Sequence, residues 1–105
     1  MRILLKASFP VETSNATIKD GSLPHKIQSI LADLKPEAAY FLANEKGQRT
    51  AYIVLDLADP SKIPGAAEPF FLAFNASVEL YPAMTAEDLM KAGPDIEAAV
   101  KKYAS

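Results

Sequence analysis

The chain has 105 residues and a mass of 11.3 kDa, a size that fits one domain around one hydrophobic core. It contains no cysteine, which excludes a disulfide scaffold, a thiolate metal site and a catalytic thiol. The formal net charge of -2 argues against a mainly electrostatic attraction to nucleic acid or anionic lipid.

The first third of the chain predicts a strand followed by an interrupted helical segment. Apolar and polar residues alternate over 2–9, which is the two-residue period of a strand, and Pro10 ends it. Helical patterns follow over residues 14–20, where Ser14 or Asn15 can cap the start, and over 22–35, where Ser22 can cap it. Gly21 separates these two patterns because it breaks helical periodicity.

The middle of the chain predicts a β-hairpin and a second helical segment. Strands over 37–44 and 49–57 flank a short loop in which Gly47 can adopt a positive φ. A helical segment follows over 61–75. Proline residues inside it predict that this helix is kinked or split.

Capping residues mark the remaining helix starts. Asp59 precedes a proline, a combination typical of an N-cap followed by the first helical position. A fourth strand is predicted over 76–82. Thr85 and Asp88 then have the three-residue spacing of a capping box, and Pro94 begins a last helix.

The resulting order is β-α-β-β-α-β with a C-terminal helical tail. This order is typical of a ferredoxin-like α+β sandwich. A right-handed crossover, with the hairpin's second strand inserted between the first two strands, predicts an antiparallel sheet of order 4-1-3-2. No internal repeat or linker is present, so residues 1–105 are expected to form one domain.

Strand alternation divides the sheet residues between two faces. Those expected to meet the helices are Ile3, Leu5, Phe9, Phe41, Ile53, Leu55, Val78 and Leu80. Those expected on the opposite face are Leu4, Lys6, Ser8, Tyr40, Leu42, Asn44, Tyr52, Val54, Asp56, Ser77, Glu79 and Tyr81. The second face is too apolar for plain solvent surface and too charged for a dry core, which favours an interface or a pocket.

The topology and one local segment resemble the dimeric α/β-barrel group of ferredoxin-like proteins. The segment is residues 70–82, FFLAFNASVELYP, in which an aromatic helix end leads into the last strand. The group includes muconolactone isomerases, cofactor-independent monooxygenases of antibiotic biosynthesis and small bacterial proteins of unassigned function. The resemblance implies that two sheets pair face to face into a homodimeric barrel with a cavity in each half, and that no cofactor is needed. The chain has no tryptophan and one histidine, so the residues that some of these monooxygenases use are not carried over.

Three charged residues on the mixed face are the candidates for proton handling. Lys6, Asp56 and Glu79 lie on strands that the expected order makes neighbours. A lysine flanked by two carboxylates can provide an acid and a base with different pKa values. The alternative is a charge-balanced network across the sheet or a dimer seam.

Four aromatic residues are the candidates for ligand binding. Tyr40, Tyr52 and Tyr81 each combine an apolar ring with a hydrogen-bond donor, which suits orienting a small ligand. The alternative for the tyrosines is packing in a subunit interface. Phe70, at the end of the second helical segment, is a further candidate, with core packing as its alternative.

Other classes of site are not expected. His25 has no second imidazole or thiolate to join it, so no metal site is predicted. Residues 49–56 match the third-strand motif of RNA-recognition domains only at its arginine and one valine, with Ala51 and Ile53 at aromatic places, so nucleic acid is not an expected partner. No apolar segment long enough to be a membrane span or a signal peptide is visible, and we expect a cytoplasmic protein.

Two functions remain open at this point. The first is binding, or isomerisation by proton transfer, of a small and partly apolar metabolite in the barrel cavity without a cofactor. The second is a non-catalytic dimeric interaction module whose mixed face only seals the dimer. Whether the protein is an enzyme, and which ligand it takes, does not follow from these residues.

Overall fold

The structure is a computed structural model that describes residues 1–104. Its elements follow the predicted order along the chain. They are β1 (Arg2–Ser8), α1 (Val11–Lys19), α2 (Ser22–Leu34), β2 (Ala38–Ala43), β3 (Arg49–Asp56), a 3-10 turn (Pro60–Lys62), α3 (Ile63–Phe74), β4 (Ser77–Pro82), α4 (Ala86–Lys91) and α5 (Gly93–Tyr103).

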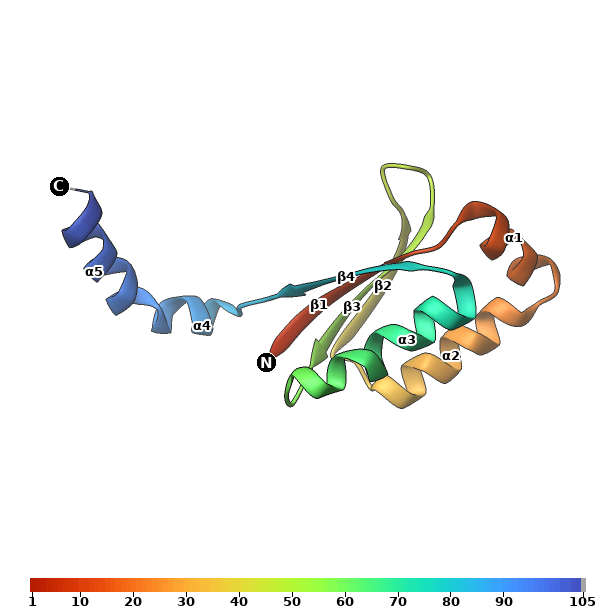
Figure 1. Cartoon of the computed structure of the whole chain (residues 1–105), viewed down its shortest axis with the longest axis horizontal. Coiled ribbons are helices and arrows are strands. Elements are labelled where there is room, and N and C mark those ends of the chain that lie inside the picture. The colour runs from red at the N-terminus through yellow and green to blue at the C-terminus, as the bar shows by residue number, and fades with distance from the viewer. Residues whose placement is uncertain (105) are drawn as a thin grey trace.

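The described strands form an antiparallel sheet of order β2-β3-β1-β4. This is the predicted order 4-1-3-2 read from the other edge, with the second hairpin strand inserted between β1 and β2. Helices α2 and α3 lie side by side along one face of the sheet (Figure 1). The prediction of a ferredoxin-like α+β sandwich is therefore confirmed.

The core lies between the sheet and helices α2 and α3. Leu5 and Ile53 from the two central strands are fully buried there, beneath Phe70 and Phe74 of α3. The ring of Phe74 stacks on that of Phe9 with centroids 4.6 Å apart. Burial of these large side chains is the main stabilising term for a chain of this size.

One residue assigned to the helix-facing side is not buried. Phe41 does face the helices, opposite Ala51 in the register, but its side chain is 52% exposed. The reason is that β2 is an edge strand and that a cavity separates Phe41 from Leu23 and Ile27 of α2 at this end of the sheet. The exposure of Phe41 corrects the expectation that it belongs to the core.

Helix starts follow the predicted caps at two places and depart from them at two. Asp59 accepts a hydrogen bond from the backbone N–H of Ser61, and Thr85 and Asp88 form the capping box of α4. By contrast, α1 begins at Val11 and not near Ser14, and the N-cap of α2 is Gly21 and not Ser22. The hydroxyl of Ser14 is buried and donates to the carbonyl of Val11, so it does not cap a helix.

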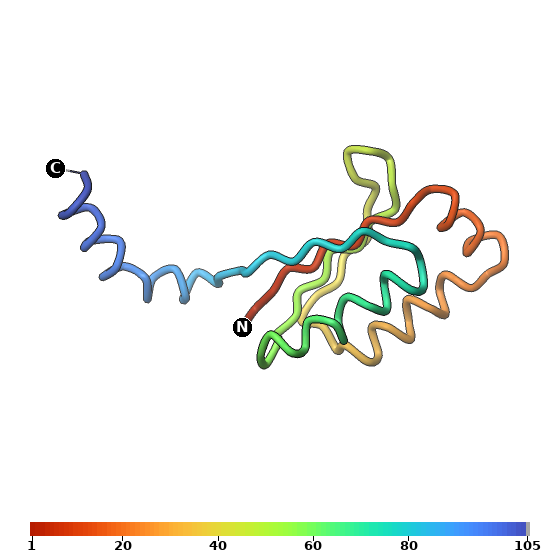
Figure 2. Tube along the Cα trace, viewed as in Figure 1, coloured from red at the N-terminus to blue at the C-terminus, as the bar shows by residue number. Residues whose placement is uncertain are grey.

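The C-terminal helices project away from the sandwich. In Figures 1 and 2 the chain leaves β4, passes the N-terminal end of β1, and continues outward through α4 and α5. The described chain measures 60 × 29 × 20 Å with a radius of gyration of 17.4 Å. A compact chain of this length has a radius of about 13 Å. None of the helices in residues 1–104 combines the length and hydropathy that crossing a bilayer requires.

Candidate functional site

The face of the sheet opposite α2 and α3 is here called the open face, and no helix within residues 1–104 lies over it (Figure 1). Across its middle the register places Tyr40, Tyr52, Lys6 and Glu79 directly opposite one another on the adjacent strands β2, β3, β1 and β4. We call these four residues the central row. Alternation along each strand is sufficient to place them on one face, as the sequence predicted, and the register brings them into line.

In the central row, the charge of Lys6 on β1 lies next to the aromatic ring of Tyr52 on β3. The ammonium of Lys6 lies 5.8 Å from the centroid of the Tyr52 ring, within the range of a cation–π interaction. Partial desolvation lowers the pKa of Lys6, but this is outweighed by Glu45, Tyr52 and Glu79, and the net pKa is raised. Lys6 is therefore a cation throughout the neutral range.

Tyr81 lies two positions after Glu79 on β4 and interacts with it. Its hydroxyl donates a hydrogen bond to Oε2 of Glu79. This bond is the main cause of the raised pKa of Tyr81, because the carboxylate disfavours the phenolate. Tyr81 therefore keeps its proton and orients the Glu79 carboxylate within the open face.

The row beside the central row is apolar. It consists of Ala38, Val54 and Leu4, with Tyr81 at its β4 end. The tyrosines at the two edges are well exposed, Tyr40 by 66% and Tyr81 by 45%. An apolar strip next to a row with a cation and a carboxylate is the mixture expected of a ligand-binding surface or an interface.

Asp56 does not join Lys6 and Glu79, although it is on a neighbouring strand. It lies opposite Arg2, which is four residues before Lys6 on β1, so about 13 Å separates the two positions along the strand. Its carboxylate accepts a hydrogen bond of 3.0 Å from the N-terminal ammonium. The sequence placed these three residues on adjacent strands, but their separation along those strands depends on the register.

Phe70 also lies away from the open face. It is fully buried on α3, on the other side of the sheet, and its ring is 6.4 Å from that of Phe9. A ligand on the open face does not reach it. Of the candidate ligand contacts, Tyr40 and Tyr52 belong to the central row and Tyr81 to the row beside it.

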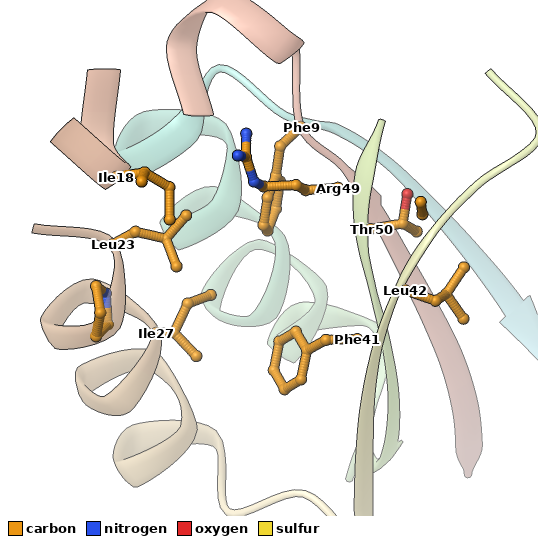
Figure 3. Close-up of a pocket in the computed structure, with 10 residues that line it drawn as sticks. Phe9, Ile18, Leu23, Ile27, Phe41, Leu42, Arg49 and Thr50 are labelled. Carbon is orange, nitrogen blue, oxygen red and sulfur yellow. The ribbon is translucent and has the colours of Figure 1, made fainter. Parts of the chain in front are cut away.

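A second site, which the sequence did not single out, lies on the helix-facing side of the sheet. A cavity of about 480 Å³ opens between α1, α2 and the hairpin end of β2 and β3. Ile18, Leu23 and Ile27 from the helices face Phe41 and Arg49 from the strands (Figure 3). The sequence pointed to this cavity only through Phe41, which it assigned to the helix-facing side. How far a helix covers an edge strand is not encoded in the local sequence, so the cavity itself was not predicted.

Metal-ligating side chains do not gather in the described part of the chain. Among residues 1–104 no group of three or more His, Cys, Asp or Glu side chains is placed to hold an ion.

Comparison with solved structures gives a likeness in fold. No family model and no curated protein matches the chain. The fold is similar to part of a crystal structure of a formyltetrahydrofolate deformylase from Pseudomonas putida KT2440, with a TM-score of 0.48 and 14% sequence identity. The match covers 79% of this chain and 29% of that protein, so the chain spans less than a third of its length.

Proposed function

We propose that the protein is a homodimer that binds a small, partly apolar molecule on the open face of its sheet. The observation that carries the proposal is the central row, in which Tyr40, Tyr52, Lys6 and Glu79 share one line on a face that no helix covers. The tyrosine rings offer flat apolar surface, Lys6 offers hydrogen-bond donors and Glu79 offers acceptors. Together they suit a ligand with an apolar body and one or two oxygen atoms.

Homodimerisation would close this site. A single copy leaves Leu4, Val54 and the tyrosine rings at the surface, and apolar patches of this kind on small proteins mark interaction sites. Two open faces related by a two-fold axis would bury each other's apolar strips and enclose the central rows. This is also the arrangement implied by the resemblance to dimeric α/β-barrel proteins.

The C-terminal helix α5 also favours a second copy of the chain as the partner. Ile96, Val100 and Tyr103 form an apolar stripe along α5, spaced at one and two helical turns, and each is more than half exposed. We call these residues the α5 stripe. An isolated helix of eleven residues is marginal in water, so the stripe needs a surface to cover it. A second copy of the chain would supply that surface.

If the bound molecule is transformed, the chemistry of the row is proton transfer. The carboxylate of Glu79 can accept a proton from a carbon or hydroxyl of the ligand, and the ammonium of Lys6 can stabilise the oxyanion that forms. The hydroxyl of Tyr81 holds Glu79 in place. This is the chemistry of an isomerase that uses no cofactor.

Light scattering behind a sizing column tests the dimer. A mass near twice 11.3 kDa is expected for the unmodified chain. Val54→Glu places a charge in the middle of the apolar strip and should give a monomer, since two like charges would meet at the two-fold axis. Ala32→Glu, on the exposed side of α2, is the matched control and should remain dimeric. A monomeric mass for the unmodified chain would refute the dimer.

A thermal-shift panel tests the ligand. Small lactones, hydroxyaromatic compounds and keto acids are suitable probes, and a ligand of the folded state raises the melting temperature. The shift should be lost in Lys6→Met and in Tyr52→Ala, and retained in Asp56→Asn because Asp56 lies outside the central row. No shift with any probe, or equal shifts in all three variants, would contradict binding on the open face.

The second candidate function is a non-catalytic interaction module, favoured by the projecting α4 and α5. In this reading the open face only seals the dimer, and the α5 stripe binds a different protein. Retention of dimer mass with no response to any probe would favour this reading over ligand binding.

A further inference from the structure

We propose that the cavity between α1, α2 and the hairpin end of β2 and β3 binds a carboxylate with an apolar tail, with Arg49 holding the carboxylate. This site is on the opposite side of the sheet from the central row. It is therefore independent of the open face and of dimerisation there.

The walls of the cavity select an apolar body. Ile18 of α1, Leu23 and Ile27 of α2, and Phe41 of β2 surround it with carbon (Figure 3). Ile18 is 47% exposed and Phe41 52% exposed, so the empty cavity leaves them in contact with water. Its volume of about 480 Å³ is within the range of pockets that hold small ligands.

Arg49 supplies a fixed positive charge at one end of this apolar space. It is the first residue of β3, and its side chain extends toward α1 beside Phe9 and Ile18 (Figure 3). Nη1 donates two hydrogen bonds of 2.8 Å, one to Oγ of Ser14 and one to Oδ1 of Asn15. Both acceptors are uncharged, so they position the guanidinium without neutralising it.

The remaining donors of Arg49 are free to bind an anion. No carboxylate in residues 1–104 lies within 4.0 Å of its guanidinium, in contrast to Arg2, which binds Glu37 through two nitrogens. Nε and Nη2 have no acceptor in the same part of the chain. These two groups have the parallel geometry that binds both oxygens of a carboxylate. An arginine anchored by neutral groups beside an apolar cavity is thus complementary to an amphipathic monoanion.

Calorimetric titration with decanoate below its micellar concentration tests the charge. Arg49→Gln should weaken decanoate about ten- to a hundred-fold, the effect of a charged hydrogen-bonded pair, and should leave binding of decan-1-ol unchanged. Asn15→Ala is the matched control, because it removes one contact of the guanidinium and keeps the charge. Its effect should be much smaller than that of Arg49→Gln.

Amide chemical shifts locate the binding site and also report whether a variant is still folded. Decanoate should shift the amides of Leu23, Ile27 and Phe41. Ala43→Trp fills the cavity from an exposed position on β2 and should abolish binding of both decanoate and decan-1-ol. If Arg49→Gln loses the spectrum of the folded protein, Arg49→Lys is used, which keeps the charge and loses the paired geometry.

Three outcomes would overturn the proposal. The first is an equal loss of affinity for decanoate and decan-1-ol in a folded Arg49 variant. This result would mean that the cavity binds apolar chains without selecting for a negative charge. The second is decanoate binding that shifts residues of the central row and leaves the cavity unaffected. The third is a change in the amide chemical shifts of the cavity residues with protein concentration, in the absence of ligand, that disappears in a variant of the α5 stripe. This result would assign the cavity to the α5 helix of a second copy.

Discussion

Replacing Ile96 and Val100 with serine tests whether a second copy covers the α5 stripe. In the single chain these side chains are 51% and 56% exposed, on a helix that projects away from the sheet sandwich (Figure 1). The substitutions therefore remove little from an isolated copy. Isoleucine, valine and serine also have similar helix propensities, so α5 itself should persist.

The two substitutions are expected to weaken the affinity of one copy for the other. Full burial of an aliphatic side chain contributes about 2 kcal/mol, so covering the exposed half of each contributes about 1 kcal/mol. Two side chains on the α5 helix of each copy then contribute about 4 kcal/mol per dimer. At 1.4 kcal/mol for each factor of ten, the dissociation constant of the dimer should rise by about a thousandfold.

Sedimentation velocity over a dilution series measures this change. The matched control is Glu97→Ser with Lys101→Ser, one residue further along α5, where both side chains are exposed and polar. The control should keep the dissociation constant of the unmodified chain. If the two double variants have the same dissociation constant, the argument that a second copy covers the α5 stripe is refuted.

Four further predictions concern stability. Phe74→Ala should lower the free energy of unfolding by about 3–5 kcal/mol in a urea titration, since it empties the space between α3 and the sheet in which the ring is fully buried against Phe9; a loss below 1 kcal/mol would contradict this packing. Thr85→Ala should cost α4 about 1 kcal/mol and speed its amide exchange with little change in the global melting temperature, because α4 projects from the sandwich (Figure 1) and the ion pair of Asp88 with Arg2, at 4.0 Å, is exposed and contributes little. The pKa of Asp88 is lowered by its hydrogen bonds to the backbone and side chain of Thr85, so the cap is complete above the ordinary carboxyl pKa of 3.8 and is lost as pH falls through the lower folded value, which an NMR pH titration detects. Lys35→Gly should stabilise the fold by about 0.5–1 kcal/mol, seen as a melting temperature a few degrees higher, because Lys35 has a φ of 47° at the end of α2.

Local signals predicted most of the elements. A capping residue such as Asp59 or Thr85 acts within three residues, so its effect can be read directly from the sequence. The start of α1 was predicted wrongly because Ser14 is a strong cap by type. In the structure it is buried and bonded to Arg49, a partner 35 residues away.

The candidate site was predicted only in part. The two-residue period of a strand placed Lys6, Tyr52 and Glu79 on one face, and the register aligned them. Asp56 has the same alternation but lies near the end of the sheet beside the N-terminus. Alternation determines a face, whereas position along the neighbouring strands depends on pairing.

The sequence by itself determined the order of elements, the sheet order and the composition of the two sheet faces, because these depend on short-range periodicity, turn chemistry and chain connectivity. Only the tertiary structure decided which surfaces remain uncovered. The exposed ring of Phe41, the cavity beside Arg49 and the projecting α5 stripe all depend on how far helices extend over the sheet. That extent results from packing between residues distant in the chain, for which no local pattern exists.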